Sequence, residues 1–515
     1  MRPFLLLLFS FLLLPAAGWP ASRLVLPGGT GDFPTIQAAV DASAPGDTVL
    51  LGDGTFSGDG NRDVAIGAGG IVVHSTSLSP GSCVLDCEGS VGSPHRGFLV
   101  SAAAGDPVTF EAFTIRNGYG ANEGGAIRCS NSGIVIRNMA LRNNGAGENG
   151  GALYVIGSPD ARIEDSGIED NHAKFGGGAW IESSTAEIVS TVFAGNVAPS
   201  ESDLGGALGM WESTVRLGDV LFDRNEGGYA GGIFSYSTEA DLTDCLFKGN
   251  RGNFACGGMY SYAGPYHPSY ANLLRCEFVG NHGSLAAGGM AISEWSASLE
   301  ECIFRENTAT YAAGVSVNGP ADFLRCRFEG NSATLNGGGV YSEISTLEFR
   351  ECVFSANAAN DSGGALFASV NSVYNLYDCT MNGNRSPVGS GIAVIFESEV
   401  TLENTIVSFG LLGAGVSWDG SGSADFSCCD IFGNEGGDWV GPIAGQLGVA
   451  GNFSADPLYC DDAAEDFTLR ADSPCLPGNH PQGENCDVVG AFGEGCGGST
   501  RVEAASWTTV KKMFR

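Results

Sequence analysis

A repeat of about 26 residues runs through most of the 515-residue chain and restricts it to a few kinds of fold. Its clearest element is a hexapeptide that ends in Asn, carries Phe at its third position and usually begins with Cys. The strongest copies end at Asn225, Asn250, Asn281, Asn307, Asn331 and Asn357, which are 24 to 31 residues apart. Weaker copies end at Asn143, Asn171, Asn196, Asn384 and Asn434, and Gly410 stands where one intervening Asn is expected.

A second marker, a glycine pair followed by a short apolar run, keeps step with the first. Each repeat holds two or three short runs with the alternation of β-strands, and none has an amphipathic pattern of helical length. One such unit cannot bury both of its faces, so it has to stack on its neighbours. The second glycines of the pairs are Gly125, Gly151, Gly178, Gly206, Gly232, Gly258, Gly289, Gly339 and Gly364, with Gly314 in a weaker copy.

Stacked coils explain which residue types recur. Every strand then pairs in parallel with its copy in the next coil, about 4.8 Å away. The Cys and Phe of the hexapeptide are two residues apart and point the same way, so we expect two interior files. The Asn is predicted to occupy a corner in left-handed conformation and to hydrogen-bond to the Asn of the next coil. The expected files are Phe247, Phe278, Phe304, Phe328 and Phe354, and the free thiols of Cys245, Cys276, Cys302, Cys326, Cys352 and Cys379.

These features resemble the right-handed parallel β-helix, or pectin-lyase-like, family, and the repeat units are similar to those of polymorphic outer membrane proteins. Residues 33–41, 45–51 and 54–56 resemble the start of secreted members, where a short helix closes the tube, here with Ile36, Ala39 and Val40 on one face. The resemblance implies an all-β chain: a single right-handed parallel β-helix with a short N-terminal capping helix and a disulfide-bearing C-terminal cap. It implies no particular activity, because many functions share this fold.

The chain divides into five segments. Residues 1–18 have the features of a signal peptide, with Arg2 before an apolar run and small residues at the expected cleavage site. We expect an N-terminal cap over 19–46, β-helical coils over 47–435, a terminal coil and cap over 436–498, and a basic tail over 499–515. The protein is therefore predicted to be secreted or held at the cell surface.

Charge limits the partners. The net charge is −33, and nucleic acids and anionic membranes both need a basic surface on the protein that binds them. No later stretch reaches the roughly 20 apolar residues of a transmembrane helix. We expect a monomer without a cofactor. Ca²⁺ would suit an acidic chain, but no specific motif supports it.

Cysteines outside the interior file need a separate explanation. Cys428 and Cys429 are adjacent and Cys83 and Cys87 are close, but no His cluster or C-x-x-C motif accompanies either pair, which argues against metal or redox sites. After the repeat lapses, disulfides would replace a missing core. Of the three pairings open to the last four cysteines, we select Cys460–Cys475 with Cys486–Cys496.

Enzymatic motifs of the family are not found. The chain has only four Lys and no Arg-x-Pro-x-x-Arg motif of the lyases. The polygalacturonase motifs Asn-Thr-Asp, Gly-Asp-Asp, Gly-His-Gly and Arg-Ile-Lys are also missing. We assign no catalytic residue. A polysaccharide lyase or glycoside hydrolase that acts on acidic polysaccharide remains the alternative to a binding protein.

The strand after the glycine pair offers a candidate binding surface. The residue after the second glycine is apolar in every copy and is expected to face inward, so the next residue should face outward. That outward column would contain Ile127, Leu153, Trp180, Leu208, Phe234, Tyr260, Ala291, Ser316, Tyr341 and Leu366. Two residues further on, the same face would present Glu182, Met210, Tyr236, Tyr262, Ser293, Asn318 and Glu343.

Aromatic rings beside carboxylates suggest glycan recognition, since sugars stack on such rings and acids bind hydroxyl groups. We therefore predict a surface or secreted binding or adhesion protein that recognises a polysaccharide or cell-surface glycan. The alternative is that the rings stack on one another only to stabilise the sheet. The candidate ligand-binding residues are Trp180, Glu182, Phe234, Tyr236, Tyr260, Tyr262, Tyr341 and Glu343, together with Tyr266 in a long loop.

Overall fold

The structure is a computed structural model that describes residues 20–102, 105–264, 269–294 and 296–496. The predicted signal peptide, Tyr266 and the basic tail lie outside the described residues. Within those ranges, no helix has the length and hydropathy needed to cross a membrane.

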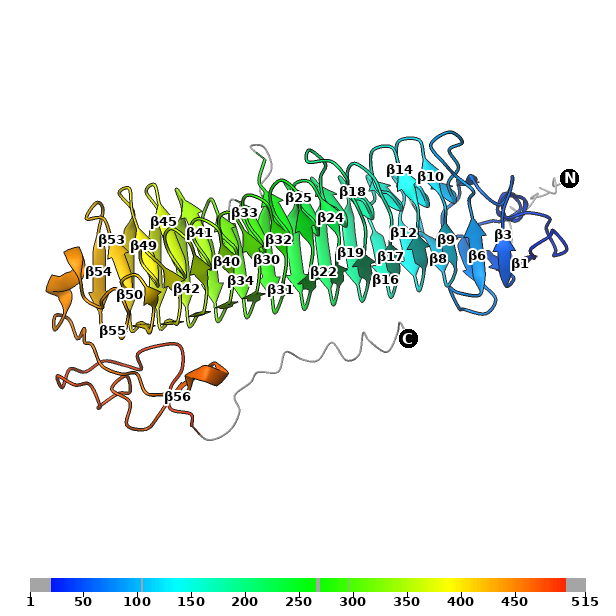
Figure 1. The fold of residues 1–515 in the computed structure, drawn as a ribbon. Helices are drawn as coiled ribbons and strands as arrows, with labels where there is room; N and C mark the ends of the chain where they lie inside the picture. Colours follow the sequence, from blue (N-terminus) through cyan, green and yellow to red (C-terminus); the bar gives the residue numbers. More distant parts are fainter. Residues whose placement is uncertain (1–19, 103–104, 265–268, 295, 497–515) are drawn as a thin grey trace, which may run out of the picture.

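The chain winds into a long parallel β-solenoid, with its first coils at one end and its last at the other (Figure 1). The first sheet has 16 strands, from β1 (Ser22–Val25) to β54 (Ala424–Ser427). The second has 14, from β4 (Val64–Ile66) to β53 (Val416–Trp418), and the third has 15, from β3 (Gly54–Phe56) to β55 (Asp430–Phe432). Two-residue strands from β24 (Glu226–Gly227) to β52 (Leu411–Leu412) form a further ladder at one corner. The predicted all-β, parallel solenoid is confirmed.

The interior Phe file is confirmed and is longer than predicted. Phe193 and Phe222 precede the five expected rings, and all seven are buried. Ring centroids of successive members are 4.4 to 5.2 Å apart, with interplanar angles of 15° or less. The file therefore runs through seven consecutive coils as one stack of parallel rings.

The predicted Cys file is also confirmed as buried free thiols. Each sulfur lies within hydrogen-bonding distance of backbone carbonyl oxygens at the corner; Cys326 Sγ, for example, is 3.3 Å from Leu299 O and 3.5 Å from Leu324 O. Cys429 occupies the equivalent position near the end of the solenoid, 3.4 Å from Leu402 O. These thiols fill the corner and add weak donors to carbonyl oxygens there, some of which, such as Leu324 O, also accept from a backbone N–H.

An Asn ladder lines another corner. In each coil the Asn Oδ1 accepts from both the backbone N–H and the Nδ2 of the Asn in the preceding coil. Asn307, for example, donates to Asn331 Oδ1 at 3.1 Å from its backbone and 3.0 Å from its side chain, and Nδ2 also donates to Phe278 O at 2.8 Å. As predicted, Gly410 takes one place in the ladder, where its N–H donates to Asn434 Oδ1 at 2.9 Å.

Two details of the Asn prediction are wrong. The first ladder residue is Asn144, which bonds to Asn171, and not Asn143. The left-handed residue is the one before the Asn, as at Glu306 (φ 55°) before Asn307. The chain completes its bend at that residue, so the amide that follows is buried and can reach the next coil.

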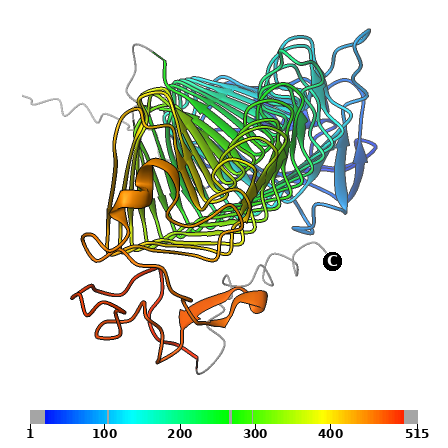
Figure 2. The same cartoon turned by 60° about the vertical axis from the view of Figure 1, so that its left-hand side comes forward.

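Both ends of the solenoid are closed. Helix α1 (Ile36–Asp41) begins after Thr35, whose Oγ1 accepts from Ala38 N–H, and buries Ile36, Ala39 and Val40 as predicted. At the other end, Ile443 of the 3₁₀-helix η1 (Gly441–Gln446) and Trp439, which precedes this helix, join the central core. Helix η1 lies over the last coils in Figure 2.

The chain after η1 turns back and packs along the outside of the third sheet (Figures 1 and 2). It contains the antiparallel pair β56 (Tyr459–Asp461) and β57 (Asp466–Leu469). Tyr459 Oη is 2.9 Å from Ser408 Oγ, and Ala491 N–H donates to Thr380 Oγ1 at 2.9 Å. The segment thus covers the outer face of several terminal coils. A second apolar cluster lies beneath it, formed by Ile406, Phe453, Leu469, Cys475, Cys486 and Val489.

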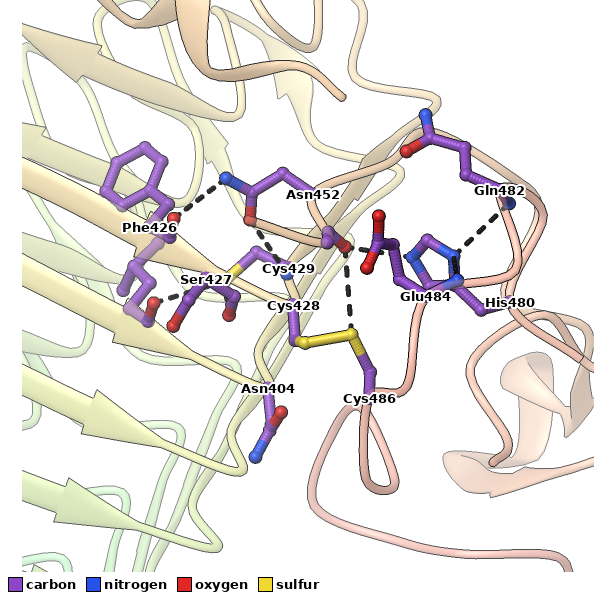
Figure 3. Close-up of a disulfide and its surroundings, with 12 residues drawn as sticks. Asn404, Phe426, Ser427, Cys428, Cys429, Asn452, His480, Gln482, Glu484 and Cys486 are labelled. Atoms are coloured by element: carbon purple, nitrogen blue, oxygen red, sulfur yellow. Dashed lines mark hydrogen bonds between the residues drawn. A yellow bond between two sulfur atoms is a disulfide. The ribbon is translucent and has the colours of Figure 1, made fainter. Parts of the chain in front are cut away.

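Two disulfides hold this segment, but the predicted pairing is wrong. Cys428 pairs with Cys486 (Figure 3), and Cys460 pairs with Cys496. Cys475 is a buried free thiol, 3.4 Å from Asp430 Oδ2. The returning segment crosses the corner where Cys428 projects outward, whereas its neighbour Cys429 faces the interior. The spacing of the cysteines in the sequence does not indicate that Cys428 and Cys486 are in contact.

Asn307→Ala is expected to weaken the coils strongly. The change leaves the Asn281 N–H and Nδ2 without the acceptor they share and Phe278 O without its donor. Buried unpaired groups of this kind should lower the unfolding free energy by about 3 kcal/mol or more. The control Asn318→Ala, at an exposed position, should change it by about 0.5 kcal/mol or less. Equal urea midpoints for the two variants would contradict the role of the ladder.

The free energy of unfolding should fall as the pH rises from about 4 to about 8, because the Asp430 carboxyl is buried in the folded protein. Burial, with a smaller contribution from Asp438 and Asp456, raises the pKa of this carboxyl to about 8. In the unfolded chain it ionises near pH 4, so across this window only the unfolded state loses the proton and is favoured. The upper limit of the loss is about 5 kcal/mol. Calorimetry at pH 5 and pH 8.5 measures the effect: the melting temperature of Asp430→Asn should fall less between these two pH values than that of wild type. The control Asp487→Asn, at an exposed position, should show the same fall as wild type.

Candidate functional site

The outward face of the second sheet carries two adjacent columns of side chains, called here the outward stripe. The columns come from the second and fourth residues of β15 (Leu153–Ile156), β18 (Ala179–Glu182), β21 (Leu208–Trp211), β25 (Ile233–Tyr236), β29 (Met259–Tyr262), β33 (Met290–Ser293), β41 (Val340–Glu343) and β45 (Leu366–Ser369), which pair in register. Three-residue β37 (Val315–Val317) contributes Ser316. The first column is Tyr154, Trp180, Gly209, Phe234, Tyr260, Ala291, Ser316, Tyr341 and Phe367. The second is Ile156, Glu182, Trp211, Tyr236, Tyr262 and Ser293, with Glu343 and Ser369 further along.

The structure brings eight of the nine candidate ligand-binding residues together on this stripe. Trp180, Phe234, Tyr260 and Tyr341 lie in the first column, and Glu182, Tyr236, Tyr262 and Glu343 lie in the second. The ninth, Tyr266, is outside the described residues. Their binding role stays a prediction.

The predicted columns are wrong in several coils. Ile127, Leu153, Leu208, Met210 and Leu366 are buried and face inward. The corner position before these strands holds Ala in some coils and Gly in others, as where Ala207 aligns with Gly178 and Gly232. Where the corner residue is Ala, a count that starts at the second glycine is one residue out of register with the other coils. An error of one residue assigns every side chain of that strand to the opposite face of the sheet. Alignment on the alternation of apolar residues would have revealed the aromatic residues that were missed, namely Tyr154, Trp211 and Phe367.

Trp180 and Phe234 are largely covered, with exposed fractions of 4% and 6%. The Trp180 indole lies over Gly209 in the next coil, where a Cβ would come within 2.0 Å of its ring. Phe175 packs against the same indole at 5.8 Å between centroids. Glycine thus leaves room for the ring, and these side chains act mainly to stabilise the face of the sheet.

The second column presents a stack of three rings. Trp211 and Tyr236 are 4.0 Å apart between centroids at 21°, and Tyr236 and Tyr262 are 5.7 Å apart at 24°. Trp211 and Tyr236 are half-buried, whereas Tyr262 is 39% exposed. Rings stacked along the axis hide most of their faces from solvent. Tyr262 ends the stack because the next coil offers Ser293 in place of another ring.

Loops beside the stripe widen its apolar surface. Tyr229 packs against Phe254 at 5.0 Å and against Tyr260 at 5.9 Å. Phe254, Leu285 and Leu335 are each more than a third exposed. Phe254 therefore adds an exposed ring that Tyr229 connects to Tyr260 of the stripe.

The carboxylates of the stripe are held by neighbouring side chains. Glu182 Oε2 accepts from Tyr154 Oη at 3.0 Å and from Trp180 Nε1 at 3.1 Å, and Tyr341 Oη donates to Glu343. Burial, and then the adjacent carboxylate, raises the pKa of both tyrosines above its ordinary value. Both phenols therefore stay protonated and keep their carboxylates oriented.

The two carboxylates are too far apart to act as a glycosidase pair. Six coil steps separate β18 from β41, or about 29 Å, whereas such enzymes need about 5 to 10 Å. Among the described residues, no group of three or more His, Cys, Asp or Glu is placed to hold a metal ion.

The family follows from sequence comparison. A family model described as "Right handed beta helix region" matches residues 84–309 and 290–453, which together span most of the chain. The chain belongs to the right-handed β-helix family, as its resemblance to that family implied. No curated protein matches the sequence.

The chain also matches solved structures of proteins with different functions. Pectate lyase Pel9A is 14% identical with a TM-score of 0.26, covering 93% of this chain and 97% of its own. PfbA, a surface adhesin of Streptococcus pneumoniae, is 12% identical with a TM-score of 0.30, covering 78% and 86%. The PL6 family alginate lyase AlyGC is 9% identical with a TM-score of 0.14, covering 79% and 97%. Identities and TM-scores this low do not indicate what this chain binds.

Trp180→Ala should destabilise the protein far more than Tyr262→Ala. Removing the covered indole leaves a cavity above Gly209, and losses of about 3 to 5 kcal/mol accompany truncations of this kind. Tyr262 is exposed and contacts the stack on one side, so about 1 kcal/mol or less is expected. Urea unfolding of both variants measures the difference. If Trp180→Ala were as stable as wild type, the sheet-stabilising role would be refuted.

Proposed function

We propose that this protein is exported and acts as a secreted or surface binding protein that recognises carbohydrate on the outward stripe. The observation that carries the proposal is the Trp211–Tyr236–Tyr262 stack, which ends in a partly exposed ring. A stack held by the strands is rigid, so a ligand loses little free energy in ordering it.

The chemistry of the stripe suits a sugar. The C–H face of a pyranose would pack on the Tyr262 ring above β33, where the neighbouring outward residues Ala291 and Ser293 are small. The Ser293 hydroxyl would pair with a sugar hydroxyl. At the other end of the stack, Glu182 is a fixed acceptor one coil from Trp211.

Export is supported by two independent features. Residues 1–18 have the composition of a signal peptide. The C-terminal segment contains two disulfides, and disulfides are typical of proteins that mature in an oxidising compartment.

A glycan array tests the proposal. The double change Tyr236→Ala and Tyr262→Ala should reduce retention of the bound glycan about tenfold or more, which corresponds to about 1.4 kcal/mol. The matched control is Phe396→Ala, an exposed aromatic residue (62%) that is not part of the stripe. Unchanged retention by the double variant would refute the proposed site. Release of unsaturated products from a polyuronate by wild type would favour a lyase instead.

A further inference from the structure

A short loop near the N-terminal end of the solenoid carries a group of side chains that the stripe does not involve. The loop joins β6 (Cys83–Asp86) to β7 (Phe98–Val100) and is firmly anchored. Gly89 N–H donates to Asn117 O at 2.7 Å, and Tyr119 N–H donates to His95 O at 2.6 Å. Ser90 and Ser93 exchange backbone hydrogen bonds at 2.9 and 3.1 Å. Residues on this loop are therefore held by the coil beneath it.

Asp63, His95 and Ser93 form a continuous chain of contacts. Asp63 Oδ2 lies 2.6 Å from His95 Nδ1, and His95 Nε2 lies 3.3 Å from Ser93 Oγ. An ionised carboxylate only accepts, so the hydrogen of the neutral imidazole belongs on Nδ1. Nε2 then faces the Ser93 hydroxyl with a free lone pair. This is the tautomer that a general base requires.

Asp63 is oriented by the backbone on the far side of the loop. Its N–H donates to Arg96 O at 2.7 Å, and its Oδ1 accepts from Arg96 N–H at 2.9 Å. One carboxylate oxygen is thus occupied, and the other is directed at the imidazole. The aspartate is a positioning residue in this arrangement, because it acts only through His95.

We propose that Ser93, His95 and Asp63 form a hydrolytic triad that cleaves carboxylic esters. Ser93 Oγ attacks the acyl carbon while its proton passes to His95 Nε2. The ester C–O bond breaks, and His95 returns that proton to the departing alkoxide, which leaves as the alcohol. Water then attacks the acyl-serine, again giving a proton to His95. The carboxylic acid departs as Ser93 Oγ recovers that proton.

The position of Ser93 defines the class of ester. The residue is exposed at the tip of its loop, so the alcohol part of the substrate can be large, including a polymer. In this exposed position the acyl part can contact single side chains such as Val91 but is not enclosed, so a long acyl chain would gain little there. The structure therefore assigns small acyl esters, such as acetyl esters, as the substrate class. This inference does not depend on glycan binding by the stripe.

Hydrolysis of p-nitrophenyl acetate by the full chain tests the triad. Wild type should hydrolyse the ester faster than the background reaction. The rates of Ser93→Ala and His95→Gln should be lower than the wild-type rate by about 100-fold or more, as expected when a nucleophile or general base is removed. Asp63→Asn should lower kcat at least about tenfold while KM changes little, because only the orientation of the base is affected. Ser90→Ala, in the same loop, should keep the wild-type rate. Circular dichroism and melting confirm that each variant is folded.

A fluorophosphonate probe supplies a readout independent of turnover. It should label wild type and Ser90→Ala on the peptide that contains Ser93, as judged by mass spectrometry, and should not label Ser93→Ala. Equal hydrolysis by wild type and Ser93→Ala, or labelling elsewhere alone, would overturn the triad. Turnover of p-nitrophenyl palmitate as fast as the acetate would overturn the assignment to small acyl groups.

Discussion

In-register hydrogen bonding between neighbouring coils is the constraint on which the whole molecule depends. A parallel solenoid places each residue above its counterpart, so a side chain has to be compatible with a copy of itself about 4.8 Å away. Phe satisfies this by ring stacking, and Asn satisfies it because one amide both donates and accepts along the axis. The Asn ladder also pairs backbone groups at a buried corner, where an unpaired group would be costly.

The same register builds the outer surface. Residues that face outward at equivalent positions form columns, so one substitution changes the surface over one coil only. Gly209 shows the effect, because it leaves the space that the Trp180 ring occupies. Ser293 shows the converse, because a small residue ends the aromatic stack and leaves Tyr262 partly exposed. Function on this scaffold can therefore differ from coil to coil while the interior is unchanged.

The C-terminal segment follows different rules, since it lies outside the repeat and has no copy to pair with. The Cys428–Cys486 disulfide, a small apolar cluster and contacts with the outer face of the third sheet hold it to the solenoid, and Cys460–Cys496 joins two parts of the segment itself. Packing there buries Asp430, and this burial raises the pKa of its carboxyl. The loop that carries Ser93 and His95 is likewise outside the repeat. The fold of this loop brings the His95 imidazole into contact with the Asp63 carboxylate.

The sequence by itself determined the solenoid, the Phe and Cys files, the N-terminal plug with Ile36, Ala39 and Val40, and the outward position of eight candidate residues. It could do so because a repeat shows which residues are stacked. The register at coils such as β15 and β21 is also written in the alternation of apolar residues, but counting from the second glycine misses it because Gly and Ala are interchangeable at the corner before each strand. Only the tertiary structure decided that Cys428 pairs with Cys486 and that Asp63 meets His95. Those contacts join segments that share no period, and their distances depend on how the chain folds back in space.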